Sequence, residues 1–270
     1  MCRYAAYLGP PLILSELIYK PANSLVHQAK DAMQSSTRIN ADGFGVGWYT
    51  PEICSEPAVF KDTSPLWNNR NLGSIAGKIR SSSIVAHVRS ASSYDPVTRE
   101  NCHPFQRGRL LWMHNGDIPG RARLTRQVAL AADDTLLAQI RGNTDTEMAF
   151  TLFLTNLAGW PDEQPTLDGL AEAMRQTLLQ IAGWHREAAE KRPLEMNFCV
   201  TDGAILVASR YAVSDQPGPT LHWYRSADER AEPAVYIASE PLFEGPEWHA
   251  AENGDLVLVN EALEVGLQRL

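Results

Sequence analysis

The chain has 270 residues, 44% of them hydrophobic, which is enough for one large folded domain or two smaller ones. Its net charge of -8 argues against a nucleic-acid partner, because contacts to phosphate need clustered Lys and Arg. No apolar run approaches the roughly 20 residues of a membrane-spanning helix, so no membrane partner is predicted. The four cysteines form no CxxC pair and the beginning of the sequence lacks secretory-signal features, which together predict a cytoplasmic protein.

Strand-like runs rich in β-branched and aromatic residues dominate both ends of the chain. In chain order, strands are predicted at residues 3–8, 43–50, 83–91, 110–116, 196–203, 205–212, 220–226, 234–240 and 255–260.

Helical periodicity occupies the middle of the chain. It is clearest at residues 146–159, where Thr144 can cap the first turn, and at 166–190. Weaker patterns favour helices near 24–34 and 123–141. Strands, then helices, then strands again predict sheets covered by helices in one α+β domain over residues 1–270.

The stretch NADGFGVGWY, residues 40–49, has three glycines at alternate positions. It resembles a nucleotide-binding loop, but no GK[ST] follows and the glycines lie within a strand pattern. Alternating glycines in a strand more often mean that another backbone or a ligand packs very close, and this is our interpretation.

Three other stretches place polar residues at the ends of predicted elements: AHVRSAS, MHNGD and NTDTE. Taken singly, Arg89 fits a surface ion pair and Asn115 with Gly116 fits a turn. Asp145 fits a carboxylate that the dipole favours at a helix N-terminus.

His87, His103, His114 and Cys102 lie within one third of the chain, a grouping that makes a metal site one hypothesis. None stands at a zinc-ligand spacing such as CxxC or HExxH, so the histidines are interpreted as packing residues and no metal is predicted. No cofactor is predicted either, and the absence of GxSxG argues against a serine hydrolase.

The order of the motifs is more specific than any one of them. An N-terminal Cys followed by NADGFGVGW, HVRSAS, HNGD and TDTE resembles the class II glutamine amidotransferase domain, a member of the N-terminal nucleophile hydrolases. Further on, MNFCVTDGAILVASR and VYIASEPLFEGPEWHAAENGDLVLVN are similar to stand-alone members, especially the EgtC-type hydrolases of ergothioneine biosynthesis. The resemblance implies a four-layer αββα sandwich, in which two stacked, mainly antiparallel sheets are covered by helices.

The resemblance makes Cys2 the nucleophile. Once an aminopeptidase removes Met1, Cys2 carries both a thiol and a free α-amine. An α-amine titrates near about 7.7–8.0, so its neutral fraction can accept the thiol proton at cellular pH.

The resemblance also implies roles for the other motif residues. Arg89 would hold the α-carboxylate of a glutamyl group through a two-pronged contact, with a further contact from Ser92. Asp145 would bind the α-ammonium. The side-chain amide of Asn115 and the backbone N–H of Gly116 would form the oxyanion hole.

The implied reaction is acyl transfer from a small-molecule γ-glutamyl amide to Cys2, followed by hydrolysis to glutamate. The preferred substrate is γ-glutamyl-hercynylcysteine sulfoxide. Its quaternary ammonium could bind against the ring of Trp48, Trp67 or Trp112, which would form a tryptophan wall. Most tryptophans, however, are core residues. The alternatives are glutamine, other γ-glutamyl amines or peptides, or ammonia supply to a separate synthase chain.

A catalytically silent amino-acid sensor is a hypothesis of another class. It is disfavoured because a sensor needs neither the thiol nor the oxyanion pair. The sequence leaves a homodimer open.

Overall fold

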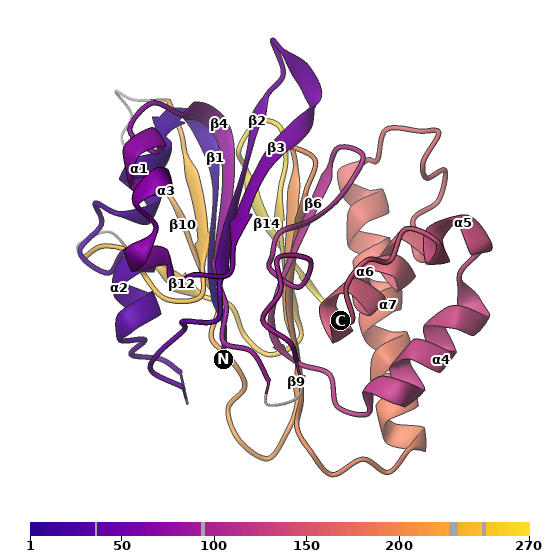
Figure 1. Cartoon of the computed structure of the whole chain (residues 1–270). Helices are drawn as coiled ribbons and strands as arrows, with labels where there is room; N and C mark the ends of the chain where they lie inside the picture. Colours follow the sequence, from indigo (N-terminus) through magenta and orange to yellow (C-terminus); the bar gives the residue numbers. More distant parts are fainter. Residues whose placement is uncertain (36, 93–94, 227–231, 245–246) are drawn as a thin grey trace.

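The computed structural model describes residues 1–35, 37–92, 95–226, 232–244 and 247–270. Two β-sheets lie face to face, and helices cover the outer face of each (Figure 1). All strand pairs recorded in both sheets are antiparallel. The expected α+β architecture of two stacked antiparallel sheets between helical layers is therefore confirmed.

The first sheet contains strands from both ends of the chain. Its order is β12 (His249–Ala250), β10 (His222–Arg225), β11 (Val235–Ala238), β1 (Arg3–Ile13), β4 (Arg80–Val88), β2 (Phe44–Thr50) and β3 (Cys54–Asp62). The helices on its outer face are α1 (Leu14–Ile18), α2 (Leu25–Lys30) and α3 (Arg70–Ile75) (Figure 1).

The second sheet is built from later strands. Its order is β14 (Val265–Arg269), β13 (Asp255–Val259), β8 (Leu206–Arg210), β7 (Leu194–Thr201), β6 (Leu110–Asp117) and β5 (Phe105–Arg107), with β9 (Ala212–Val213) beside β7. The helices on its outer face are α4 (Arg121–Ala131), α5 (Asp134–Leu137), α6 (Asp145–Asn156) and α7 (Leu167–Glu187) (Figure 1).

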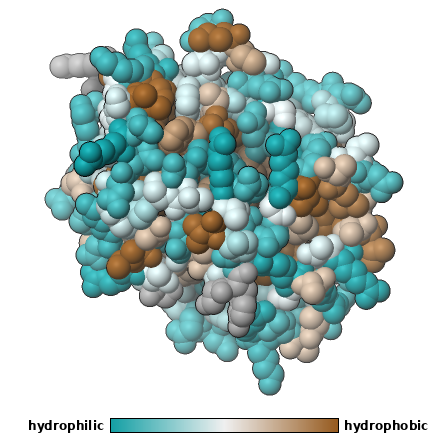
Figure 2. Space-filling model, viewed as in Figure 1, coloured by the Kyte–Doolittle hydropathy of each residue, from teal (hydrophilic) through white to brown (hydrophobic). Residues whose placement is uncertain are grey.

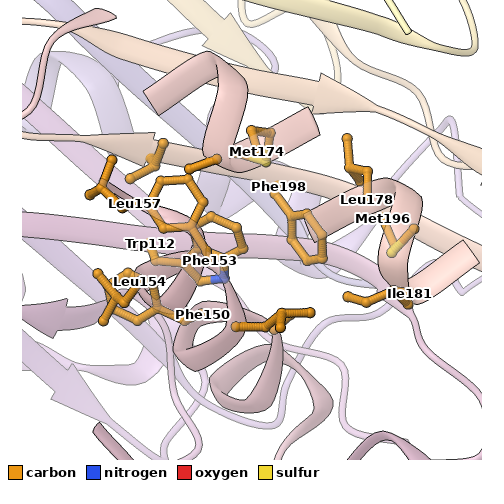
Figure 3. Close-up of a cluster of buried hydrophobic side chains, with 14 of the residues drawn as sticks. Trp112, Phe150, Phe153, Leu154, Leu157, Met174, Leu178, Ile181, Met196 and Phe198 are labelled. Carbon is orange, nitrogen blue, oxygen red and sulfur yellow. The ribbon is translucent and has the colours of Figure 1, made fainter. Parts of the chain in front are cut away.

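Four layers enclose three hydrophobic cores, one at each interface between layers. Strand β6 shows how alternation produces two of them, because successive side chains point to opposite faces of a sheet. Leu111 and Met113 lie in the core between the sheets, whereas Trp112 lies under the helices. The Trp112 ring packs against Phe150 of α6 and Phe198 of β7, with centroids 5.3 and 4.7 Å away (Figure 3).

The glycines of β2 allow the two sheets to approach. A Cβ added to Gly45 would lie 2.1 Å from the His103 carbonyl oxygen, and one added to Gly47 would lie 2.6 Å from a methyl of Leu111. This confirms the interpretation that the alternating glycines mark close approach of another part of the chain.

The predicted elements are present with shifted ends. Thr144 caps α6 by accepting a hydrogen bond from the Glu147 N–H at 3.1 Å, as expected. The helix expected over 123–141 is instead two helices, because Asp133 caps a new start by accepting the Leu136 N–H at 2.9 Å.

Several short elements were missed, notably β3, β5, β14, α1 and α3. Strand β3 contains Pro57, which weakens a strand pattern but is tolerated at a sheet edge, where this strand lies. Across the described ranges, no helix combines the length and apolar composition needed to span a bilayer.

Candidate active site

Cys2 and Asn115 come from different sheets but point into the same space between them. In β1, Tyr4 and Ala6 face the second sheet, and Cys2 continues this alternation one step earlier. In β6, Leu111 and Met113 face the first sheet, and Asn115 continues that series. Both Cys2 and Asn115 are buried.

The Cys2 thiol contacts the chain just after β4. Its Sγ accepts a hydrogen bond from the Ser90 N–H at 3.4 Å and lies 3.6 Å from the Ser90 carbonyl oxygen. Burial raises the pKa of this thiol, so it stays protonated near neutral pH unless a base removes the proton. The structure includes Met1, whose α-amine has its pKa lowered by burial.

Asn115 and Gly116 lie near the end of strand β6. The Asn115 amide nitrogen donates to Ser239 Oγ at 3.3 Å, and the same oxygen accepts the Tyr4 N–H at 3.0 Å. Gly116 cannot carry a side chain, because an added Cβ would lie 2.0 Å from the Glu195 carbonyl oxygen. Ser239 was not predicted as a site residue from the sequence. It lies in the segment VYIASEPLF, which was noted only for its similarity to stand-alone family members.

Arg89 follows β4 directly, and its side chain is buried. One guanidinium nitrogen donates to the Pro96 carbonyl oxygen at 3.2 Å, and another lies 3.8 Å from the Asp95 carboxylate. Arg121, at the start of α4, pairs with the other oxygen of Asp95. Asp95 thus connects two cations, and neither Asp95 nor Arg121 was singled out from the sequence.

Asp145 is the first residue of α6. Its carboxylate accepts the Ile118 N–H at 2.8 Å and the Thr146 N–H at 2.7 Å. The first contact ties Asp145 to the segment that follows Gly116. Ser92 joins the same region, since its hydroxyl lies 3.4 Å from an Asp117 carboxylate oxygen.

These segments surround an open cavity of about 540 Å³, called here the substrate cavity. It is lined by Met1, Thr37, residues 90–92, residues 116–121 and Arg192. The cavity therefore brings Ser92 and Gly116 together beside the neighbours of Cys2, namely Met1 and Ser90. Cys2, Asn115, Arg89 and Asp145 are not among its lining residues. Asn115 directly precedes the lining residue Gly116, and Asp145 bonds to the lining residue Ile118. Arg89 is linked to the lining residue Arg121 through Asp95.

The tryptophan wall considered from the sequence does not line this cavity. Trp112 is fully buried under the helices of the second sheet. Trp48 and Trp67 pack against the core between the first sheet and its helices. All three tryptophans are thus packing residues.

The three histidines are buried and bonded within the protein. The rings of His87 and His103 lie 4.0 Å apart, and His87 Nε2 lies 3.0 Å from the His114 carbonyl oxygen. Burial lowers the pKa of His87 to about 3, so it is neutral at physiological pH. In the described residues, no three His, Cys, Asp or Glu side chains are grouped as metal ligands.

Comparison with known proteins agrees with this architecture. The family described as "Glutamine amidotransferases class-II" matches residues 22–215. The chain is 35% identical to the probable glutamine amidotransferase DUG3 of Saccharomyces cerevisiae, over 97% of this chain and 82% of that protein. The chain belongs to the class II glutamine amidotransferase family, whose members are enzymes of the N-terminal nucleophile hydrolase fold.

Two further similarities are informative. The γ-glutamyl-hercynylcysteine sulfoxide hydrolase of Mycolicibacterium smegmatis is 26% identical over 97% of each chain. The solved structure of a glutamine aminotransferase class-II domain protein from Silicibacter pomeroyi aligns with a TM-score of 0.71 at 25% identity, over 99% of this chain and 98% of that one.

Proposed function

We propose that this protein hydrolyses a γ-glutamyl amide bond through a thioester on Cys2 and releases glutamate. One observation carries the proposal. The buried Cys2 thiol, which precedes β1, and the Asn115 amide and Gly116 backbone of β6 come from two segments far apart in the sequence and converge at one end of the intersheet space, beside the substrate cavity.

The reaction needs a base for the thiol. With Met1 removed, the α-amine of Cys2 accepts the thiol proton, and the sulfur attacks the γ-carbonyl carbon. The Asn115 amide and the Gly116 N–H stabilise the oxyanion. The carbon–nitrogen bond then breaks, the leaving amine takes the proton, and water hydrolyses the thioester to glutamate.

Removal of Met1 is therefore a first prediction. While Met1 is attached, the Cys2 nitrogen is part of a peptide bond and cannot act as a base. Intact-mass spectrometry of the active protein should show a chain that begins at Cys2. Full activity of a chain that retains Met1 would contradict the proposed base.

Substrate capture is assigned to Arg89, Asp145 and Ser92. The buried guanidinium of Arg89 now lies beside the Asp95 carboxylate, so this position already accommodates a carboxylate partner. The Asp145 carboxylate, fixed by two backbone N–H groups, would bind the substrate ammonium. Holding both charged groups places the γ-carbonyl over the sulfur.

Arg89→Lys should mainly weaken capture, because Lys keeps the charge but loses the planar fork. We expect KM to rise by about tenfold to a hundredfold, since a lost hydrogen bond to a charged group costs about 1.5–3 kcal/mol. Steady-state kinetics check this, with Arg123→Lys as the control because Arg123 pairs with Glu187 on the surface. Unchanged kinetics in Arg89→Lys would count against the assigned role.

The leaving group decides the biological role. The resemblance to sulfoxide hydrolases makes γ-glutamyl-hercynylcysteine sulfoxide one candidate. A second candidate, a γ-glutamyl peptide, is favoured by the cavity lining, which contains no tryptophan for a quaternary ammonium. Its two arginines, Arg121 and Arg192, are paired with Asp95 and Glu190 and would have to exchange these partners for a substrate carboxylate. The higher identity to the yeast amidotransferase does not favour the sulfoxide.

A substrate panel separates these outcomes. We expect a larger γ-glutamyl conjugate to be preferred over glutamine, because binding energy from the leaving group can raise kcat. The measurement is kcat/KM for glutamine, a γ-glutamyl-cysteine peptide and the sulfoxide side by side. Preference for glutamine would move the protein to the ammonia-supplying class. No glutamate release from any of the three would overturn the hydrolase proposal.

A further inference from the structure

A second cavity, of about 640 Å³, lies apart from the substrate cavity and shares no lining residue with it. Its walls come from the edge strands β3 and β5, the start of α6, and the loops around Arg99 and Arg141. The volume falls in the range of small-molecule sites. On the face drawn in Figure 2, hydrophobic residues are scattered among hydrophilic ones. Most of the residues that line the second cavity are polar or charged.

The cavity gathers positive charge in an acidic protein. Lys61, Arg99, Arg107 and Arg141 line it together with two carboxylates, whereas the whole chain has a net charge of -8. Such a concentration of like charge raises the local concentration of anions.

One of the two carboxylates, that of Glu147, is already bound within the protein. Glu147 accepts from the Arg107 guanidinium at 3.1 Å and from the backbone N–H groups of Arg141 and Gly142 at 3.0 and 2.7 Å. Within the described residues, Lys61, Arg99 and Arg141 form no ion pair. Three cations therefore line the cavity without an ion-pair partner, and the second carboxylate of the lining, Glu100, offsets the charge of only one of them.

Lys61 is the most enclosed of the three. Its side chain is half-buried, and Nζ lies 4.8 Å from the centre of the Phe105 ring. Burial lowers the pKa of this amine to about 8, with smaller opposing effects from Cys102 and Glu147 and reinforcing ones from Arg107 and Arg99. An enclosed ammonium without a carboxylate partner is costly unless an anion compensates it.

We infer that this second cavity binds a small multivalent anion, one bearing phosphate groups or several carboxylates, between Lys61, Arg99 and Arg141. The guanidinium groups of Arg99 and Arg141 suit the planar, two-pronged contacts that both kinds of anion accept. Lys61 adds a point charge from strand β3.

Titration calorimetry of the full chain with pyrophosphate and with citrate, at constant ionic strength, tests the inference. We expect saturable binding of at least one probe, and the stronger probe identifies the class of anion. Lys61→Gln/Arg99→Gln should weaken it by about tenfold or more, because charge-assisted hydrogen bonds are lost. Since Lys61 is half-buried, Arg99→Gln/Arg141→Gln repeats the test with exposed side chains only.

The matched control is Arg70→Gln/Lys78→Gln, which removes the same charge from exposed positions around α3. It should bind like the wild type. Equal weakening in the control pair, or no saturable binding of either probe at millimolar concentration, would overturn the inference.

A pH series with sulfate, which keeps its charge, gives a second readout. Binding needs the charged form of Lys61, so affinity should fall as pH rises from 7 through about 8, the pKa of that amine. An affinity that is flat over this range would exclude Lys61 as a ligand.

Discussion

Cys2→Ala should lower glutamate release by roughly 10⁴-fold or more, because no other group replaces a missing nucleophile. The substitution removes only the sulfur, whose hydrogen bonds are with the Ser90 backbone, so we expect the binding residues to keep their positions. Alanine also permits removal of Met1, which leaves the N-terminal amine in place. Kinetics give the loss of turnover, and calorimetry with the preferred γ-glutamyl substrate should show nearly unchanged affinity.

Cys54→Ala is the matched control, since Cys54 is a free and exposed thiol at the start of β3. It should keep wild-type kinetics. Retained turnover in Cys2→Ala would show that another group carries the acyl intermediate, whereas lost affinity would show that the sulfur is part of the binding site.

Asn115→Ala has the second largest expected effect. Loss of one oxyanion-hole donor should lower kcat by about 10²- to 10³-fold, or about 2.7–4 kcal/mol of transition-state stabilisation, with a much smaller change in KM. Ser239→Ala should have a weaker effect of the same kind, because Ser239 holds the amide at 3.3 Å and does not itself contact the oxyanion.

Asn156→Ala is the matched control for Asn115→Ala, because it removes a side-chain amide from α6, outside the proposed site. Its nitrogen donates to Thr177 Oγ1 at 3.1 Å in the helical layer, so its loss should reduce the melting temperature without changing kcat. If Asn115→Ala raised KM and spared kcat, the amide would serve ground-state binding and not the oxyanion.

The family and the fold were predictable from the sequence because their signals are local. The alternation of Leu110 to Met113 indicates a strand with two buried faces, and Thr144 marks the start of α6. The order of the Cys2, Arg89 and Asp145 motifs indicated the family, which the comparisons confirm. The roles of these residues in the reaction stay predictions.

Only the tertiary structure decided which residues meet. Ser239 bonds to Asn115 across 124 positions of the chain, and this contact depends on β11 pairing with β1 and on one sheet packing over the other. The network joining Arg89, Asp95 and Arg121 depends on Asp95 lying beside both the residue after β4 and the first residue of α4. Local patterns determine which face of a strand is apolar, but the pairing and stacking of strands depend on contacts between distant segments, which no short stretch of sequence encodes.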